Sequence, residues 1–404
     1  MKKRLQDIWI SLRKSFTDNG STTIFTVIIM SSLVLLVIMF VSVTRMKAET
    51  GRADALLSLS ARSVLSEYSI SLKERYGLLA VDTTPTAIEE DMRFYMGEND
   101  SSLDISEMNI SVIGYTLADS RNLEKEINEY AVFLLGQELF DENEKTNSDR
   151  KGDRVLKNKR IISALPSGGK AGSDISIDGV VDAMKNLDEI FDRAKKTVSV
   201  NEYLMAVCNH QLSDDGETFF KNEIEYIVSG EMSDEKNYSK MKRKIRLLRN
   251  AVNLGVIFTN PEMLEKVTAA ASATGPASGL TTALLAEAWA YAEAYNDVKI
   301  LENGGKIPVI KTKETWAVDL ESVLKNDADG YIDNNCENGL EYDDYLRIFL
   351  YFTDKETKLE RFADLVQINI QGTTDENFMM KTACTGFSYS ATINGRKYRY
   401  EEAY

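Results

Sequence analysis

The sequence predicts an α+β protein in which one long N-terminal transmembrane and amphipathic helix precedes a helix-rich extracytoplasmic domain with small antiparallel sheet elements. Three observations support this fold class. Residues 21–44 form an uncharged apolar run, apolar residues then recur at helical spacing to about residue 72, and an alternating pattern flanks Asn394-Gly395 near the C-terminus. The chain has 404 residues, of which 43% are apolar, so we expect one large or two modest globular units.

Residues 21–44 are predicted to cross a membrane once. They carry no charge, and their number matches the roughly 20 apolar residues that span about 30 Å of hydrocarbon. A buried core helix is the alternative, but such helices rarely remain uncharged over this length. Five basic residues lie in the leader, residues 1–20, and three follow the span closely, which favours a cytoplasmic N-terminus. A cleavable secretory signal is less favoured, because its apolar region would be shorter and would end in a small-x-small site.

The helical pattern continues beyond the membrane through residues 45–75. Apolar residues recur at steps of three and four from Ala53 to Tyr68, and no proline occurs before Pro85. We therefore expect one helix from about Ser21 to about Leu72, which would be roughly 75–80 Å long at 1.5 Å per residue. Its second half would pack on the outer domain, an arrangement that suggests a pilin.

Residues 76–404 are predicted to form the extracytoplasmic α+β domain. Residues 141–170 are rich in Lys, Asp and Asn and end near a Pro-Ser-Gly-Gly sequence, so they form a polar excursion and the best candidate for a boundary. Residues 386–401 alternate around Asn394-Gly395, the strongest short-range signal of a hairpin. Further strands are expected at Tyr76–Val81 and Met108–Tyr115, and helices at Asn122–Leu139, Val180–Val198, Val200–Cys208 and Met232–Phe258.

A second uncharged stretch, Val267–Ala286, raises the question of a second membrane span. It consists mostly of Ala, Ser and Thr, and Gly275-Pro276 interrupts it. Low content of large apolar residues and a Gly-Pro break favour a buried segment that packs through small side chains.

Composition excludes several classes of function. The net charge of −15 is opposite in sign to the basic patch that nucleic-acid binding requires. Three cysteines and one histidine are too few to converge on a structural zinc ion. No phosphate-binding loop, dinucleotide fingerprint, HExxH or GxSxG sequence occurs. We therefore predict no enzyme activity, no cofactor, no small-molecule substrate and no nucleic-acid partner.

Four groups of polar residues are candidate sites. Asp327, Asp329 and Asp333 imitate a calcium-binding loop around Gly330, but Lys325 and Cys336 occupy two of its strongest ligand positions, which favours a solvated acidic turn.

Cys208 and His210 could form a nucleophile and base, although no oxyanion device is visible. The carboxylates of Glu341, Asp343 and Asp344 precede an amphipathic stretch, where they would complement the dipole of a helix start. A disulfide between Cys336 and Cys384 is one interpretation of an exported domain, and free buried thiols are the other.

Three parts of the chain resemble a known family. They are similar to a membrane-anchored family of Gram-positive anaerobes that is associated with tight-adherence (Tad, or Flp) pilus loci and is TadE/TadG-like at its N-terminus. The resemblance covers nearly the whole chain and implies a place in or beside a pilus, but no particular biochemical activity. It rests on Asn19–Phe25 through the apolar run to Ser66–Tyr68 and Glu74–Ala80; on Glu223–Gly230 with Leu247–Asn253; and on Ala288–Glu293 with Gly305–Pro308 and Gly339–Arg347.

The resemblance to pilins implies cleavage after Gly20, which would make Ser21 the first mature residue. The fifth mature position of major pilins is glutamate, whereas here it is Phe25. A minor, tip or assembly-platform component of a Tad-type pilus therefore fits better than a bulk subunit, with the lipid bilayer and pilus or secretion-platform proteins as partners. The alternative is a surface-anchored adhesin or binding module unrelated to filaments, held by an uncleaved single-pass anchor.

Overall fold

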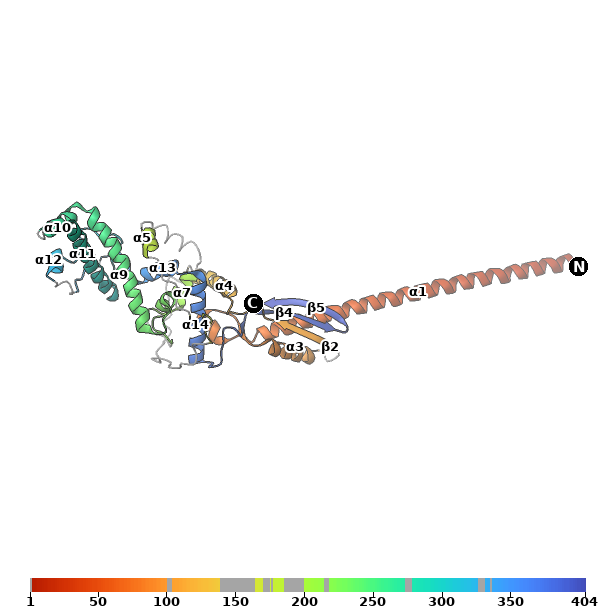
Figure 1. The fold of residues 1–404 in the computed structure, drawn as a ribbon. Coiled ribbons are helices and arrows are strands. Elements are labelled where there is room, and N and C mark those ends of the chain that lie inside the picture. Colours follow the sequence, from red (N-terminus) through yellow and green to blue (C-terminus); the bar gives the residue numbers. More distant parts are fainter. Residues whose placement is uncertain are drawn as a thin grey trace. The chain divides into compact units, whose positions relative to one another are not determined.

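The structure, a computed structural model, describes residues 2–99, 104–138, 164–169, 175, 177–184, 200–213, 218–272, 278–325, 331–334 and 336–404 (Figure 1). Its elements are mostly helices, with small antiparallel sheets, so the predicted α+β class is confirmed. The chain divides into two compact units. Unit 1 comprises Met1–Ser66, Thr86–Ile110 and Ser388–Glu402, and unit 2 comprises Glu67–Pro85, Ser111–Phe387 and Ala403–Tyr404.

Helix α1 spans Lys2–Leu65 and thus contains the predicted leader, the apolar run and most of the amphipathic segment. The prediction that one helix continues to about Leu72 was wrong. Helix α2, Ile70–Tyr76, is separate because the Oγ of Ser69 accepts a hydrogen bond from the Leu72 amide and caps its N-terminus. Four residues, 66–69, therefore separate the two helices.

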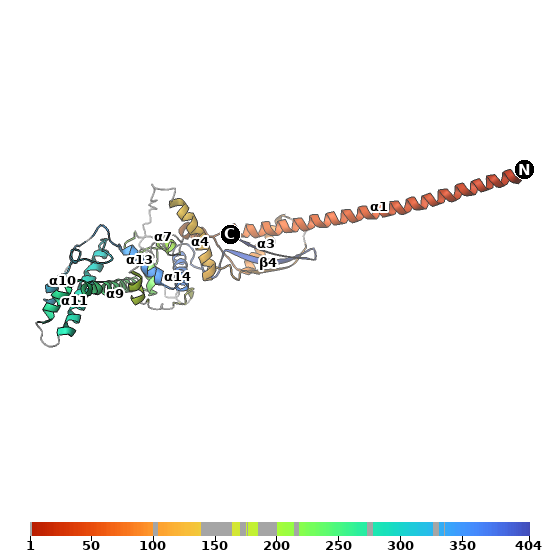
Figure 2. The same cartoon turned by 90° about the horizontal axis from the view of Figure 1, so that it is seen from above.

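Unit 1 is built around the second half of α1. Helix α3, Pro85–Asn99, and a three-stranded sheet of order β2-β4-β5 lie beside it (Figure 2). The strands are β2, Ile105–Ser111; β4, Gly386–Ile393; and β5, Arg396–Ala403. Strand β2 begins and ends earlier than the predicted strand at Met108–Tyr115. The predicted C-terminal hairpin is confirmed, with positive φ at Asn394 (50°) and Gly395 (75°) as its two-residue turn requires.

The core of unit 1 forms where one face of α1 meets α3 and alternate residues of β4. Apolar side chains recur at three- and four-residue steps on α1, and every second residue of β4 is buried. The buried set includes Ala53, Leu57, Ala61, Val64, Ile88, Met92, Met96, Met108, Tyr389, Ala391 and Ile393. This packing explains why the second half of α1 is amphipathic.

Unit 2 has a large core between short helices. These are α2; α4, Ser120–Glu138; α5, Ile177–Met184; α7, Val200–Val207; α8, Glu223–Ser229; α13, Tyr342–Phe352; and α14, Lys355–Thr373. The strand predicted at Tyr76–Val81 was wrong: Gly77 (φ 65°) ends α2, and only β1, Val81–Asp82, pairs with β3, Ala383–Cys384. Residues 185–198 of the helix predicted at Val180–Val198, and residues 141–163 of the polar excursion, lie outside the described residues.

Four further helices complete unit 2. They are α9, Asp234–Thr259; α10, Pro261–Ser272; α11, Ser278–Glu302; and α12, Leu320–Leu324. Helix α9 joins the two cores of the unit, since Met241 and Ile245 lie in the large core and Val256 and Ile257 lie in a second one with Trp289. The uncharged stretch Val267–Ala286 falls across α10 and α11 and buries Val267, Ala271 and Ala286, as expected of a packing segment.

Candidate functional site

The apolar first half of α1 is the most distinctive surface of the described residues. Its large side chains from Ile24 to Val43 are exposed; Phe25, for example, is 66% exposed and Leu35 is also 66% exposed. Within the described part of the chain, α1 is the one helix that is long and apolar enough to cross a membrane. An uninterrupted apolar cylinder of this kind is stable in hydrocarbon because all its backbone groups are bonded within the helix. It is the candidate membrane anchor.

The two halves of α1 are chemically different surfaces on one continuous helix. Hydroxyl groups inside the apolar half are satisfied locally: the Oγ1 of Thr26 donates to the Thr22 carbonyl, and the Oγ of Ser32 donates to the Ile28 carbonyl, both at 2.8 Å. In the second half, Leu57 and Ala61 are fully buried in unit 1. Gly20 and Ser21, the residues weighed for cleavage, lie within the helix before the apolar half.

The surroundings of Cys208 and His210 do not favour a nucleophile and its base. The Nδ1 of His210 lies 3.6 Å from Asp343 Oδ1 and accepts a hydrogen bond from the Leu212 amide. Burial raises the pKa of the Cys208 thiol well above its usual value, and burial lowers the pKa of His210. A nucleophilic cysteine needs a lowered thiol pKa and a nearby basic partner, so both shifts disfavour that role.

The acidic residues near the start of α13 have a structural role, as predicted. Glu341 is the residue before the helix, and its amide donates to Asp344 Oδ2 at 3.0 Å. The Glu341 carboxylate also forms an ion pair with Lys306. These contacts satisfy the helix start and complement its dipole.

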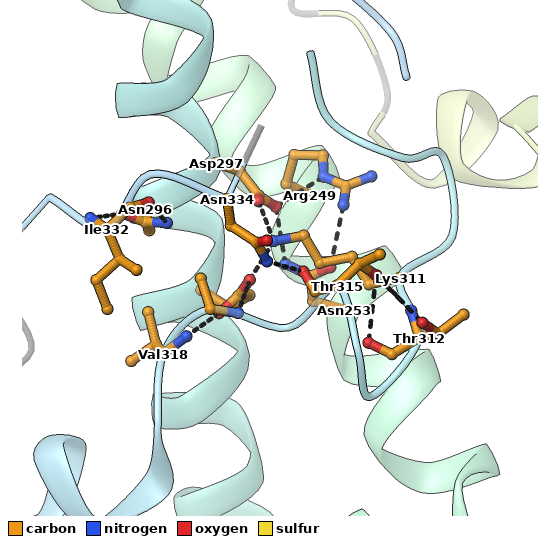
Figure 3. Close-up of polar contacts among 12 residues, drawn as sticks. Arg249, Asn253, Asn296, Asp297, Lys311, Thr312, Thr315, Val318, Ile332 and Asn334 are labelled. Carbon is orange, nitrogen blue, oxygen red and sulfur yellow. Dashed lines mark hydrogen bonds and ion pairs between the residues drawn. The ribbon is translucent and has the colours of Figure 1, made fainter. Parts of the chain in front are cut away.

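Two of the three carboxylates of the calcium candidate, Asp327 and Asp329, lie outside the described residues, whereas Asp333 lies within them. The part of the chain that the structure describes contains no group of three or more His, Cys, Asp or Glu side chains that could hold a metal ion. The adjacent Ile332 is tied to α11 instead: its amide donates to Asn296 Oδ1 and its carbonyl accepts from Asn296 Nδ2, both at 2.9 Å (Figure 3).

All three cysteines are free thiols, so the disulfide weighed between Cys336 and Cys384 is absent from the structure. Cys384 is buried in β3, where it pairs with Val81 across the small sheet. Cys336 lies elsewhere in unit 2, where its amide donates to the Lys306 carbonyl at 3.1 Å. Cys336 and Cys384 are thus each held by their own backbone contacts.

The structure reveals a buried ionic cluster that the sequence analysis missed (Figure 3). Arg249 on α9 donates through Nε to Asp297 Oδ2 on α11 at 2.9 Å, and Lys311 contacts Asp297 Oδ1 at 2.5 Å. Lys311 also pairs with Glu293, whose carboxylate accepts from the Val318 amide at 2.7 Å. Although burial disfavours the charged form, Arg249 and Lys311 hold the pKa of Asp297 below its usual value.

The ionic cluster fixes the loop after α11 rather than opening a site. Its four charged side chains are at most 2% exposed, and each has an opposite charge in contact. A cavity of about 130 Å³ lies nearby, lined in part by Trp289, Trp316 and Asp319, but ligand pockets usually measure about 300–1,000 Å³. The sequence signal for the cluster was the placement of Glu293 and Asp297 on the buried stripe of α11, beside Ala290 and Ala294.

A second buried group surrounds helix α8, all of whose residues are buried. Glu223 accepts hydrogen bonds from the Asn209 amide and the Asn369 side chain at 2.8 and 2.6 Å. Glu225 accepts from the Tyr342 hydroxyl at 2.7 Å and from the Gln211 amide at 3.1 Å. The helix ends at Gly230 (φ 70°), where the guanidinium of Arg361 occupies the space that a Cβ would need.

These carboxylates are held largely out of water. Burial raises the pKa of Glu223, and it raises the pKa of Glu225 to about 7. Perturbed carboxyl groups are common at functional sites but also in structural networks. Here, each glutamate bonds a backbone amide of the turn after α7, which ties that turn to α8 and favours a structural role.

Comparisons with known proteins give a family but no characterised relative. No curated protein and no solved structure matches the chain. A family model described as a family of unknown function, DUF5702, matches residues 142–395, which is more than half of the chain. The chain therefore belongs to DUF5702, a family of unknown function.

Proposed function

We propose that the chain is a pilin-like, membrane-anchored component of a Tad-type pilus, or of the envelope machinery that assembles it, and that it acts through protein–protein contacts. The observation that carries the proposal is the division of α1 into an exposed apolar half and a half packed against α3 and the β2-β4-β5 sheet. A pilin needs these two properties together. The apolar half holds the subunit in the membrane, and the packed half joins it rigidly to a folded domain.

The proposed topology is single-pass, with the N-terminus in the cytoplasm and both globular parts outside. Five basic residues in the leader support this orientation, because positive charge is retained on the cytoplasmic side. The exposed apolar half of α1 would be unfavourable in a protein that is surrounded by water. Exposing so many large apolar side chains to water would be costly, at about 25 cal/mol for each Å².

The mature N-terminus is the first test of the proposal. Mass spectrometry of membrane-extracted protein should find a chain that starts at Ser21. A Gly20→Val variant should keep its leader, because the small residue before the cut is lost, whereas Gly51→Val, on the same helix with open space around it, should be processed normally. A chain that still starts at Met1 would argue against pilin-type processing and favour an uncleaved anchor.

Protein contacts of α1 provide the second test. A photo-crosslinking residue replacing Leu35 in living cells should capture a second copy of the chain or a pilus-platform protein through the exposed apolar half. The same residue replacing Leu57, which is fully buried, serves as the matched control and should react within the chain. Capture of lipid alone at Leu35 would refute a role in filament assembly.

A surface-anchored adhesin or binding module is the second candidate. Phe25 favours it, because it occupies the position where major pilins carry a glutamate that neutralises a neighbour's amino terminus. A chain with an intact leader and only lipid contacts in the membrane would support this alternative.

A further inference from the structure

Unit 1 carries a concentration of positive charge at the end of its packed region that adjoins the apolar half of α1. We name it the basic collar. Two segments that are distant in the sequence, residues 45–52 of α1 and residues 394–399 of the hairpin, contribute six exposed basic side chains and one carboxylate, Glu49. The basic side chains are Arg45, Lys47, Arg52, Arg396, Lys397 and Arg399. The whole chain, in contrast, has a net charge of −15.

Hydrogen bonds within unit 1 bring the two segments together. The Nη1 of Arg396 donates to Thr50 Oγ1 at 2.6 Å, and the Tyr400 hydroxyl donates to Asp54 Oδ1 at 2.6 Å. Strand β5 therefore runs along α1 in the same direction as the helix, with the hairpin turn at the end nearer the apolar half of α1 (Figure 1). The collar is thus a feature of the fold and not of one local sequence.

The collar lies at the depth of lipid headgroups if α1 spans the membrane. Thr50 is six residues beyond Thr44, the last residue of the uncharged run, so it lies about 9 Å further along the helix. Headgroup regions extend roughly 5–8 Å beyond the hydrocarbon on each side. Arginine and lysine side chains are long enough to reach back across the remaining distance.

Charge complementarity identifies the ligand class. Glu49 pairs with Arg45 at 3.0 Å, and Asp104 lies beside the turn, where its amide donates to Asn394 Oδ1 at 3.2 Å. Asp54, which accepts from the Tyr400 hydroxyl, is a third carboxylate at this surface. The six basic side chains still outnumber these three carboxylates. We propose that the basic collar binds the phosphate headgroups of anionic phospholipids in the leaflet from which α1 emerges. The proposal rests on the proposed function in one respect, namely that α1 spans the membrane.

The collar places positive charge on the side of the membrane opposite the leader. Basic residues outside the cytoplasm oppose the usual orientation rule when they lie in short flanking loops, but large domains are exported largely regardless of charge. Three of the six belong to the C-terminal hairpin and join the collar only after folding. Headgroup binding would then hold unit 1 at the membrane surface.

The test compares lysine reactivity in two membranes. The full-length chain is placed in nanodiscs of phosphatidylcholine with or without phosphatidylglycerol, and a water-soluble amine-reactive ester labels it for mass spectrometry. Lys397 should react at least about fivefold more slowly in the anionic nanodiscs, and molar salt should restore its rate. Lys325 of unit 2, which is exposed, is the internal reference and should react equally in both.

A double variant, Arg396→Gln with Arg399→Gln, should lose most of the slowing at Lys397. The matched control, Lys236→Gln with Arg243→Gln, removes the same charge from the exposed face of α9 and should retain it. Slowing that persists in the first variant would reflect surface potential alone and would overturn the proposal. Inorganic phosphate that slows Lys397 in neutral nanodiscs would indicate a general anion site and overturn the assignment to lipid.

The two proposals fail in different ways in this experiment. Equal rates at Lys397 in nanodiscs that contain the chain would overturn headgroup binding and leave the anchor intact. A chain recovered outside the nanodiscs would overturn the anchor itself, and the collar with it.

Discussion

We predict that the Glu225 carboxyl makes unit 2 less stable as the pH rises. Its Oε1 accepts hydrogen bonds from the Tyr342 hydroxyl and the Gln211 amide, whereas its Oε2 is buried without a hydrogen-bond partner among the described residues. Burial, with a smaller contribution from the Asp234 carboxylate, raises the pKa of this carboxyl from 4.5 to about 7. The folded state therefore favours the protonated acid.

The sign and size of the effect follow from the two pKa values. Between pH 4.5 and about 7 the folded state binds a proton at Glu225 that the unfolded state releases. The free energy of unfolding should therefore fall as pH rises through this window, by about 3 kcal/mol at 1.36 kcal/mol per pKa unit. Asp297 acts elsewhere: its pKa is held below 3.8, so the stability it contributes is lost only at more acidic pH.

Glu225→Gln should abolish this pH dependence. The glutamine oxygen can replace Oε1, and its amide nitrogen can lie where the protonated oxygen was. We expect a variant about 2–3 kcal/mol more stable than the native chain at pH 8 and nearly equal to it at pH 5. Glu223→Gln is the matched control on the same helix. Both oxygens of Glu223 accept hydrogen bonds, so the amide would face a donor, and this variant should be about 1–3 kcal/mol less stable than the native chain at pH 5.

Urea unfolding in detergent, followed by tryptophan fluorescence, measures these differences. Trp289 and Trp316 both lie in unit 2, and α9 contributes to both cores of that unit, so we expect the cores to unfold together. The reasoning would be refuted by a native chain and a Glu225→Gln variant whose free energies of unfolding change in parallel from pH 5 to pH 8.

Three further predictions concern the packing of both units. Lys311→Met should destabilise unit 2 by about 3–5 kcal/mol in urea unfolding, because Asp297 loses one of its two buried cations; a loss below about 1 kcal/mol would contradict this. Gly230→Ala should lower the melting temperature because a Cβ at φ 70° would meet an arginine, whereas Gly97→Ala in α3, where space is open, should leave it unchanged or higher. Under native conditions, maleimide should label Cys336 before the two buried thiols, and equal rates would show that the cores open readily.

Periodic patterns predicted the elements whose stability is local. The apolar run and the spacing after it predicted α1, and Asn394-Gly395 predicted the hairpin because few residues other than glycine and asparagine tolerate positive φ. The end of α1 was missed for a physical reason. Apolar spacing continues past Leu65, but the Ser69 side chain offers a cap that starts a second helix, and a periodicity count does not detect a cap.

The buried charges show where a single sequence stops being informative. Glu293 and Asp297 stand at the spacing of buried residues on α11, which signals that they are buried, but it does not name their partners. Arg249 lies 48 residues away from Asp297 in the chain. Only the packing of α9 against α11 brings the two side chains together. The sequence therefore indicates that a buried Asp297 needs a positively charged partner, but it does not identify Arg249 as that partner.

Sequence patterns also do not show which distant elements of unit 1 pack together, so the boundary of this unit was not predicted. The hairpin was predicted from its turn, and the amphipathic face of α1 was predicted from its spacing, yet nothing in either pattern says that they pack on each other. Their register is set by contacts such as Ser58 with Glu402 and Thr50 with Arg396, between residues about 345 positions apart. The entropic cost of closing a loop grows only slowly with its length, so the two ends of a chain can form one compact unit while the residues between them form another. Membrane attachment through α1 would fix the first of these ends and thereby keep the hairpin beside the bilayer, where the basic collar can act.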